Sequence, residues 1–162
     1  MNLIPELKTM PRTLLAGRHL TMSYVHDRTF ELWSSFMPVR KNIQDAVGNN
    51  LFSVQVFADD YFDHFNPARE FEKWAAVEVR DQEAVAAGME TLVIPEGLYA
   101  VFIHKGPASE GPRTFGYIFQ TWLPASGYIA DNRPHFEILG EKYRNNDPSS
   151  EEEVWIPIRP VK

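Results

Sequence analysis

The chain has 162 residues, a formal net charge of −6, 44% hydrophobic residues, 13% aromatic residues and no cysteine. This length and composition favour one globular domain, and the lack of cysteine excludes disulfides, thiolate metal sites and cysteine nucleophiles. The lysines and arginines are scattered without a basic cluster, so we expect no direct nucleic-acid binding. No apolar run is long enough to cross a bilayer and no signal peptide is visible, so we expect a cytoplasmic protein without membrane contact.

The first half of the chain predicts the order strand, helix, strand, strand. Apolar residues recur at helical spacing through Trp33 and Phe36, and Pro38 is expected to end this helix. The flanking segments alternate between apolar and polar residues, as strands do. The expected elements are a strand over residues 14–24, a helix over 29–37, and strands over 52–57 and 74–80.

The second half repeats this order. Trp122-Leu123-Pro124 matches the end of the first helix, so Pro124 is expected to end the second. The expected elements are a strand over residues 90–104, a helix over 114–123, and strands over 134–139 and 153–159. Repetition at one offset indicates a single domain over residues 1–162 with internal repeats over about 13–81 and 89–160. We predict an α+β fold with two strand-helix-strand-strand modules in a pseudo-twofold arrangement, an antiparallel sheet, helices, and a ligand cleft between the repeats.

The seam between the repeats is the place where we expect a site. Gln55 and Glu137 hold matching positions in matching strands, each between apolar neighbours. If their face of the sheet lines the cleft, Glu137 is a carboxylate in aromatic surroundings, and a cationic ligand would balance its charge. If that face is open to solvent, both are ordinary exposed polar residues. Trp33 and Trp122 lie near the helix ends that are expected to face the seam.

Other chemistry has little support in the sequence. The five histidines show no metal-ligand spacing, so we predict no metal site. We also find no glycine-rich phosphate loop and no Gly-x-Ser-x-Gly turn, and we therefore predict no cofactor. No nucleophile and base pair points to an enzyme.

Several motifs together resemble the GyrI-like family of effector-binding domains, which includes DNA gyrase inhibitor proteins and the ligand domains of AraC-type and MerR-type multidrug regulators. The resemblance runs from about residue 13 to 159. Its motifs are Trp33-x-x-Phe36-Met37-Pro38, Ala75-Ala76-Val77-Glu78-Val79, Ile94-Pro95-Glu96-Gly97-Leu98-Tyr99-Ala100-Val101-Phe102, Trp122-Leu123-Pro124, Gly127-Tyr128, Pro134-His135-Phe136-Glu137 and Glu152-Glu153-Val154-Trp155-Ile156-Pro157-Ile158.

The resemblance implies two strand-helix-strand-strand (SHS2) modules with a ligand cleft at their junction and a central acidic residue, which here corresponds to Glu137. It also implies aromatic residues that hold flat or lipophilic cations. In falling order of expectation these ligand-binding residues are Tyr99, Trp122, Trp155, Trp33 and Phe36.

The function that we predict is binding of a small, lipophilic and cationic molecule. The chain differs from the regulators in one respect. They carry a helix-turn-helix domain, for which this chain has no room, so we expect a sensor domain standing alone. Two alternatives stay open. In the first, Glu137 is the general base of a small hydrolase of strained electrophiles, which the resemblance also allows. In the second, the protein inhibits a partner such as gyrase through an acidic surface over residues 151–153, or acts with a separate regulator.

Overall fold

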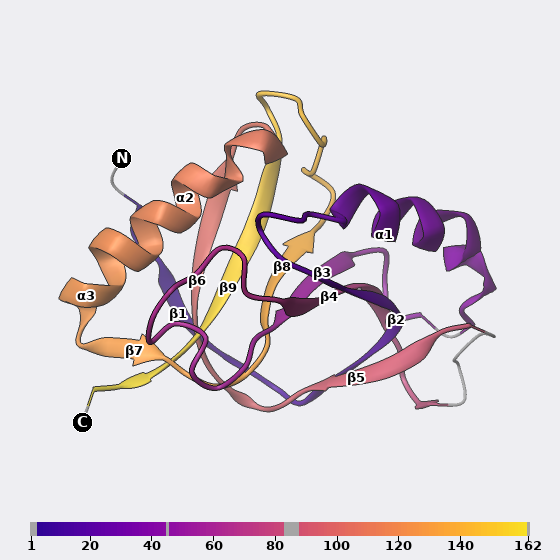
Figure 1. Cartoon of the computed structure of the whole chain (residues 1–162). Coiled ribbons are helices and arrows are strands. Elements are labelled where there is room, and N and C mark those ends of the chain that lie inside the picture. Colours follow the sequence, from indigo (N-terminus) through magenta and orange to yellow (C-terminus); the bar gives the residue numbers. More distant parts are fainter. Residues whose placement is uncertain (1–2, 45, 83–87, 162) are drawn as a thin grey trace.

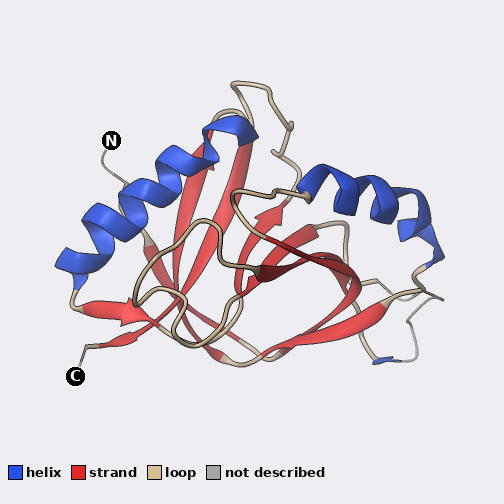
Figure 2. Ribbon diagram, viewed as in Figure 1, coloured by secondary structure: helices blue, strands red, loops and turns tan. Residues whose placement is uncertain are grey.

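The computed structural model describes residues 3–44, 46–82 and 88–161, and Figures 1 and 2 show its arrangement. The strands form one antiparallel sheet in the order β1-β6-β9-β8-β3-β4-β2-β5, with the short β7 paired to β9. Their bounds are β1 Glu6–Met10, β2 Thr13–Met22, β3 Leu51–Val56, β4 Phe71–Glu78, β5 Glu90–Ile94, β6 Gly97–Lys105, β7 Tyr128–Ala130, β8 His135–Leu139 and β9 Glu151–Pro160. The predicted α+β class with an antiparallel sheet and helices is confirmed.

Both helical segments lie over the same side of the sheet (Figure 2). The first is α1 (Thr29–Phe36), which continues as the 3₁₀ helix η1 (Met37–Asn42). The second begins with a short 3₁₀ turn, η3 (Ala108–Glu110), and its parts are α2 (Gly111–Tyr117), the π-helical η4 (Ile118–Trp122) and α3 (Leu123–Ser126).

The first α-helix ends at Phe36, before Pro38, as predicted, although the chain continues as the 3₁₀ helix η1. The prediction that Pro124 ends the second helix was wrong. Pro38 lies in the first turn of η1, where a helix has no partner for the missing N–H. Pro124 also lies in a first turn, that of α3, directly after the π-helical segment. A π turn widens the helix locally, which gives the proline ring room that a regular α-helix denies it. The second helix ends instead at Gly127, whose φ of 81° suits glycine.

The order strand, helix, strand, strand occurs twice, as β2-α1-β3-β4 and as β6-α2-β8-β9. The two copies meet where β3 pairs with β8 in the middle of the sheet, with Ser53 opposite Glu137 and Gln55 opposite His135. The strand expected over residues 90–104 is two strands, because Pro95 lies in the turn that carries the chain from β5 at one edge to β6 near the other. β1 was not expected from the sequence.

The apolar residues form three packed groups. One lies between α1 and the sheet around Leu32 and Phe36, and a second lies between α2 and the sheet around Phe102 and Ile118. A third fills the opposite face of the sheet around Phe136. The middle of the helix-bearing face, where β3 meets β8, therefore lies between two separate apolar cores.

Gly17 in β2 tests how closely this sheet is packed. A Cβ atom at Gly17 would lie 2.0 Å from the carbonyl oxygen of Ala75 in the neighbouring β4. We expect Gly17→Ala to lower the free energy of unfolding by about 3 kcal/mol, because the backbone of two paired strands must move apart. The matched control is Gly116→Ala in α2, where a Cβ meets nothing within 4 Å and should stabilise by about 0.5–1 kcal/mol. Equal urea midpoints for the two variants would contradict this packing.

No helix in the described ranges combines the length and the apolar character that spanning a membrane requires.

Candidate functional site

Four polar side chains lie together at the junction of β3 and β8. Ser53, Gln55, His135 and Glu137 are 5%, 6%, 5% and 7% exposed, and their register places all four on the helix-bearing face. They lie between the core under α1 and the core under α2. We call these four residues the central polar cluster. Such burial of polar groups in the middle of a sheet is costly unless each finds a partner.

Only one of the two carboxylate oxygens of Glu137 has a hydrogen-bond partner among the described residues. Gln55 Nε2 donates a hydrogen bond to Glu137 Oε1 at 3.2 Å, whereas Oε2 is buried and has no hydrogen-bond partner in the part of the chain that the structure describes. Burial raises the pKa of Glu137 to about 7. The positive charge of Lys73 and the side chains of Gln55 and Ser53 oppose this rise, and the negative charge of Glu152 adds to it. The site therefore holds a carboxyl group that is close to half ionised at neutral pH.

The surroundings of Glu137 combine acidic and aromatic groups. Burial raises the pKa of Glu152, on the same face of β9, to about 6, and the positive charge of Lys73 in β4 opposes this rise. Tyr24 is half exposed over its side chain, yet desolvation and then the charge of Glu137 raise the pKa of its phenol. Tyr61 is fully buried and its hydroxyl also lacks a partner among the described residues. Two carboxyl groups against one lysine make this region suited to a cation.

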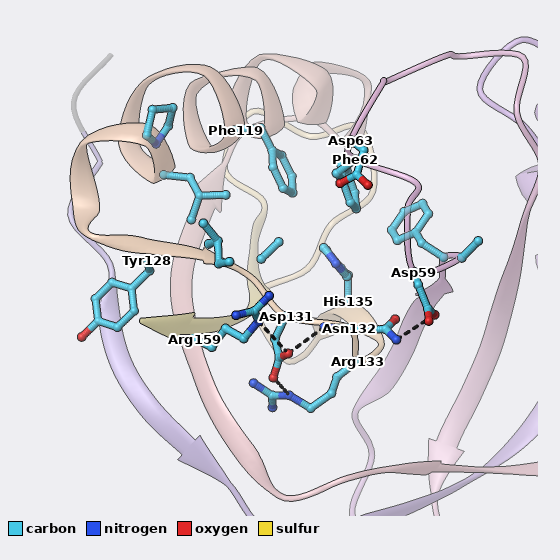
Figure 3. A pocket seen from close by; sticks show the side chains of 16 residues that line it. Asp59, Phe62, Asp63, Phe119, Tyr128, Asp131, Asn132, Arg133, His135 and Arg159 are labelled. Carbon is cyan, nitrogen blue, oxygen red and sulfur yellow. Dashed lines mark hydrogen bonds and ion pairs between the residues drawn. The ribbon is translucent and has the colours of Figure 1, made fainter. Parts of the chain in front are cut away.

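A cavity of about 430 Å³ lies beside the central polar cluster (Figure 3). It is enclosed by the end of the second helix, by β7 and by the loop between β3 and β4. His135 contributes to its wall, whereas Glu137 and Gln55 do not. The lining residues are Phe57, Ala58, Asp59, Phe62, Asp63, Phe119, Leu123, Pro124, Tyr128, Ile129, Ala130, Asp131, Asn132, Arg133, His135 and Arg159.

The structure does not bring Tyr99 and Trp155 together with Glu137. Glu137 pairs with Val154 across β8 and β9, so the next residue, Trp155, faces the opposite side of the sheet. There it stacks on Phe136 at 5.3 Å and meets Tyr99 edge to face at 5.7 Å. Both aromatic side chains are buried in the core of that face.

The other three expected aromatic residues lie on the same face of the sheet as Glu137, but they pack into the apolar groups under the two helical segments. Phe36 is fully buried under α1 and meets Trp33 edge to face at 5.9 Å. Trp122 packs against Phe102 at 5.2 Å under the second helix. The aromatic side chains that do contact the central polar cluster are Phe57, Phe62 and Phe119, which surround His135.

Sequence reasoning missed His135 and its aromatic neighbours. A signal for His135 exists, because it lies two residues before Glu137 in a strand and so shares its face. Phe62 offers no such signal, since it lies in the loop between β3 and β4. The run at residues 151–153 is not a uniform acidic surface either, because all three side chains are half-buried and Glu153 accepts a hydrogen bond from Trp155 Nε1 at 2.9 Å.

No group of three or more histidine or carboxylate side chains in the described residues is arranged to hold a metal ion.

The sheet carries one helical segment of each repeat on the same face, with a buried carboxyl group between their two cores, an arrangement suited to a small-molecule-binding domain. The chain belongs to the family of the GyrI-like small molecule binding domain, whose family model matches residues 5–159.

Among curated proteins, the transcriptional regulator BrlR of Pseudomonas aeruginosa is 27% identical over 158 residues. The match takes in 97% of this chain and 56% of BrlR, so the chain spans about half the length of that relative. The domain is thus related to a domain found in a regulator.

Solved structures show the same fold. SAV2435 bound to tetraphenylphosphonium has a TM-score of 0.74 and 13% sequence identity, over 96% of this chain and 93% of that one. The C-terminal domain of EcmrR has a TM-score of 0.74 and 15% identity, over 99% and 100% of the two chains. At these identities the likeness concerns the fold alone.

Proposed function

We propose that this protein is an effector-binding protein that takes up a lipophilic organic cation, with Glu137 as the countercharge. The observation that carries the proposal is the buried Oε2 of Glu137, which has no protein partner within the described chain. A buried carboxylate with one oxygen unpaired is unfavourable until a positive charge arrives, so its desolvation favours a cation over a neutral molecule of the same shape.

The surroundings support the same ligand class. Tyr24, which is half exposed and lies near enough to feel the charge of Glu137, offers a ring face, and a cation over such a face gains about 1–2 kcal/mol once water is excluded. Lys73 disfavours a ligand of high charge, because it lies near enough to affect both Glu137 and Glu152. A protein of the same fold has been solved with tetraphenylphosphonium, a bulky aromatic cation, which makes that ion a suitable first probe.

The test is titration calorimetry with tetraphenylphosphonium at pH 8. Glu137→Gln should weaken binding at least tenfold, because the amide keeps the shape of the carboxylate and removes its charge. Glu141→Gln, which changes the charge of the protein equally at an exposed position, should bind like the wild type. Equal affinities of the wild type and Glu137→Gln would remove the proposal.

Hydrolysis is the second function that this site supports. A carboxyl group with a pKa of about 7 in a desolvated place suits a general base at neutral pH. Turnover of a strained electrophile that is lost in Glu137→Gln, with unchanged folding, would favour this function over binding alone.

A further inference from the structure

The cavity beside the central polar cluster contains a buried histidine side chain that makes no hydrogen bond to the residues that the structure describes. His135 is 5% exposed and points into the cavity toward Phe119 (Figure 3). Within the described residues its ring nitrogens make no hydrogen bond, and its neighbours are aromatic rings. The ring of Phe57 meets it edge to face at 5.0 Å, and those of Phe62 and Phe119 lie within 23° of parallel at 5.3 Å and 6.1 Å.

The imidazole is neutral. Burial lowers the pKa of His135 to about 3, with the charge of Arg133 as the second cause. A neutral imidazole has one N–H donor and one bare nitrogen acceptor. A molecule in the cavity that supplies the partner of either nitrogen in place of water would gain about 0.5–1.5 kcal/mol net.

The charged groups of the cavity, by contrast, largely have partners. Asp131 pairs with Arg133 at 2.9 Å and with Arg159 at 3.5 Å, and Asp59 accepts a hydrogen bond from Asn132 at 2.7 Å. Nη1 of Arg133 is buried without a hydrogen-bond partner among the described residues, but the guanidinium lies beside Gly97 and over the Tyr99 ring. Asp63, the remaining charged group of the lining, is exposed, so solvent screens its charge. The inner wall therefore favours a molecule that hydrogen-bonds to the neutral histidine over one that brings a charge.

The apolar part of the wall favours a flat molecule. Phe62 and Phe119 lie with their ring planes 10° apart and their centroids 5.0 Å apart, so they present ring faces in almost the same orientation as that of His135. A planar aromatic molecule laid against these faces gains stacking as well as burial of apolar area. The cavity volume of about 430 Å³ is within the range of small-molecule sites.

We propose that this cavity is a second binding site, for an uncharged planar aromatic molecule whose hydroxyl or ring N–H hydrogen-bonds to His135. The site stands apart from the proposed cation site, because Glu137 and Gln55 do not line the cavity. The two proposals can therefore succeed or fail separately.

The test uses 2-naphthol, a neutral planar phenol, with naphthalene as the matched probe that lacks the hydroxyl. In nitrogen-15 NMR spectra of the wild-type protein, 2-naphthol should shift the ring signals of His135, and naphthalene should shift them much less. His135→Phe keeps the aromatic ring and removes both nitrogens, so it should weaken 2-naphthol binding about five- to tenfold and leave naphthalene binding nearly unchanged. Glu137→Gln should bind 2-naphthol like the wild type.

Unshifted His135 signals at saturating 2-naphthol would overturn the proposal, and this measurement needs no variant to fold. Loss of 2-naphthol binding in Glu137→Gln would also overturn it, because the phenol would then occupy the cation site. Loss of tetraphenylphosphonium binding in Glu137→Gln with intact 2-naphthol binding supports two separate sites.

Discussion

Replacing Glu137 by glutamine is expected to stabilise the folded protein by about 3 kcal/mol at pH 8 and to leave its stability nearly unchanged at pH 4.5. The pKa of Glu137 rises from 4.5 to about 7 on folding. Between these values the folded state binds more protons than the unfolded state, so this group's contribution to stability is complete below pH 4.5 and is lost as the pH rises to 7. Each pKa unit corresponds to about 1.4 kcal/mol, and glutamine cannot ionise.

The measurement is urea unfolding of both proteins at pH 4.5, 6 and 8. The difference between variant and wild type is the quantity of interest, because the contributions of other groups, such as His19 with its two glutamate partners, cancel in it. A variant that is less stable than the wild type at pH 8 would show that a protein group balances the Glu137 charge. The central site would then not need a ligand for that purpose.

Binding of tetraphenylphosphonium is expected to strengthen with pH and to level off above about pH 7.5. Only the ionised form of Glu137 offers a countercharge, and with a pKa of about 7 it is almost fully ionised at pH 8.5 and only about 3% ionised at pH 5.5. The apparent affinity should therefore fall about 30-fold between these two pH values, with close to one proton released per cation bound below pH 6.

Calorimetry in buffers of different ionisation enthalpy measures both quantities. The Glu137→Gln variant is the control, since its weaker affinity should vary with pH much less, through Glu152 alone, whose pKa is about 6. An affinity of the wild-type protein that is constant from pH 5.5 to 8.5 would mean that the charge of Glu137 takes no part in binding.

The central polar cluster could be predicted from the sequence because it depends on local rules. Matching of the two halves aligned Gln55 with Glu137, and strand alternation placed each opposite its apolar neighbours. The structure adds that β3 and β8 are direct neighbours, which brings the two side chains to hydrogen-bond distance. That adjacency required the order of the strands, which depends on contacts far apart in the chain.

The aromatic residues around the site could not be predicted in the same way. Trp155 and Val154 are equally apolar, and only the pairing of β9 with β8 decides that Val154 shares the face of Glu137. A shift of one residue in this register would exchange them. Phe62 reaches the site from a loop, whose path depends on tertiary packing and carries no periodic signal.

The most direct test of the account is to measure the ionisation of Glu137 itself, by carbon-13 NMR of its side-chain carboxyl group through a pH titration with and without tetraphenylphosphonium. Our account predicts a midpoint near pH 7 in the free protein, and a midpoint below about 5.5 when the cation is bound. A midpoint that stays in place on saturation with the cation would contradict a role for this carboxylate in holding the ligand.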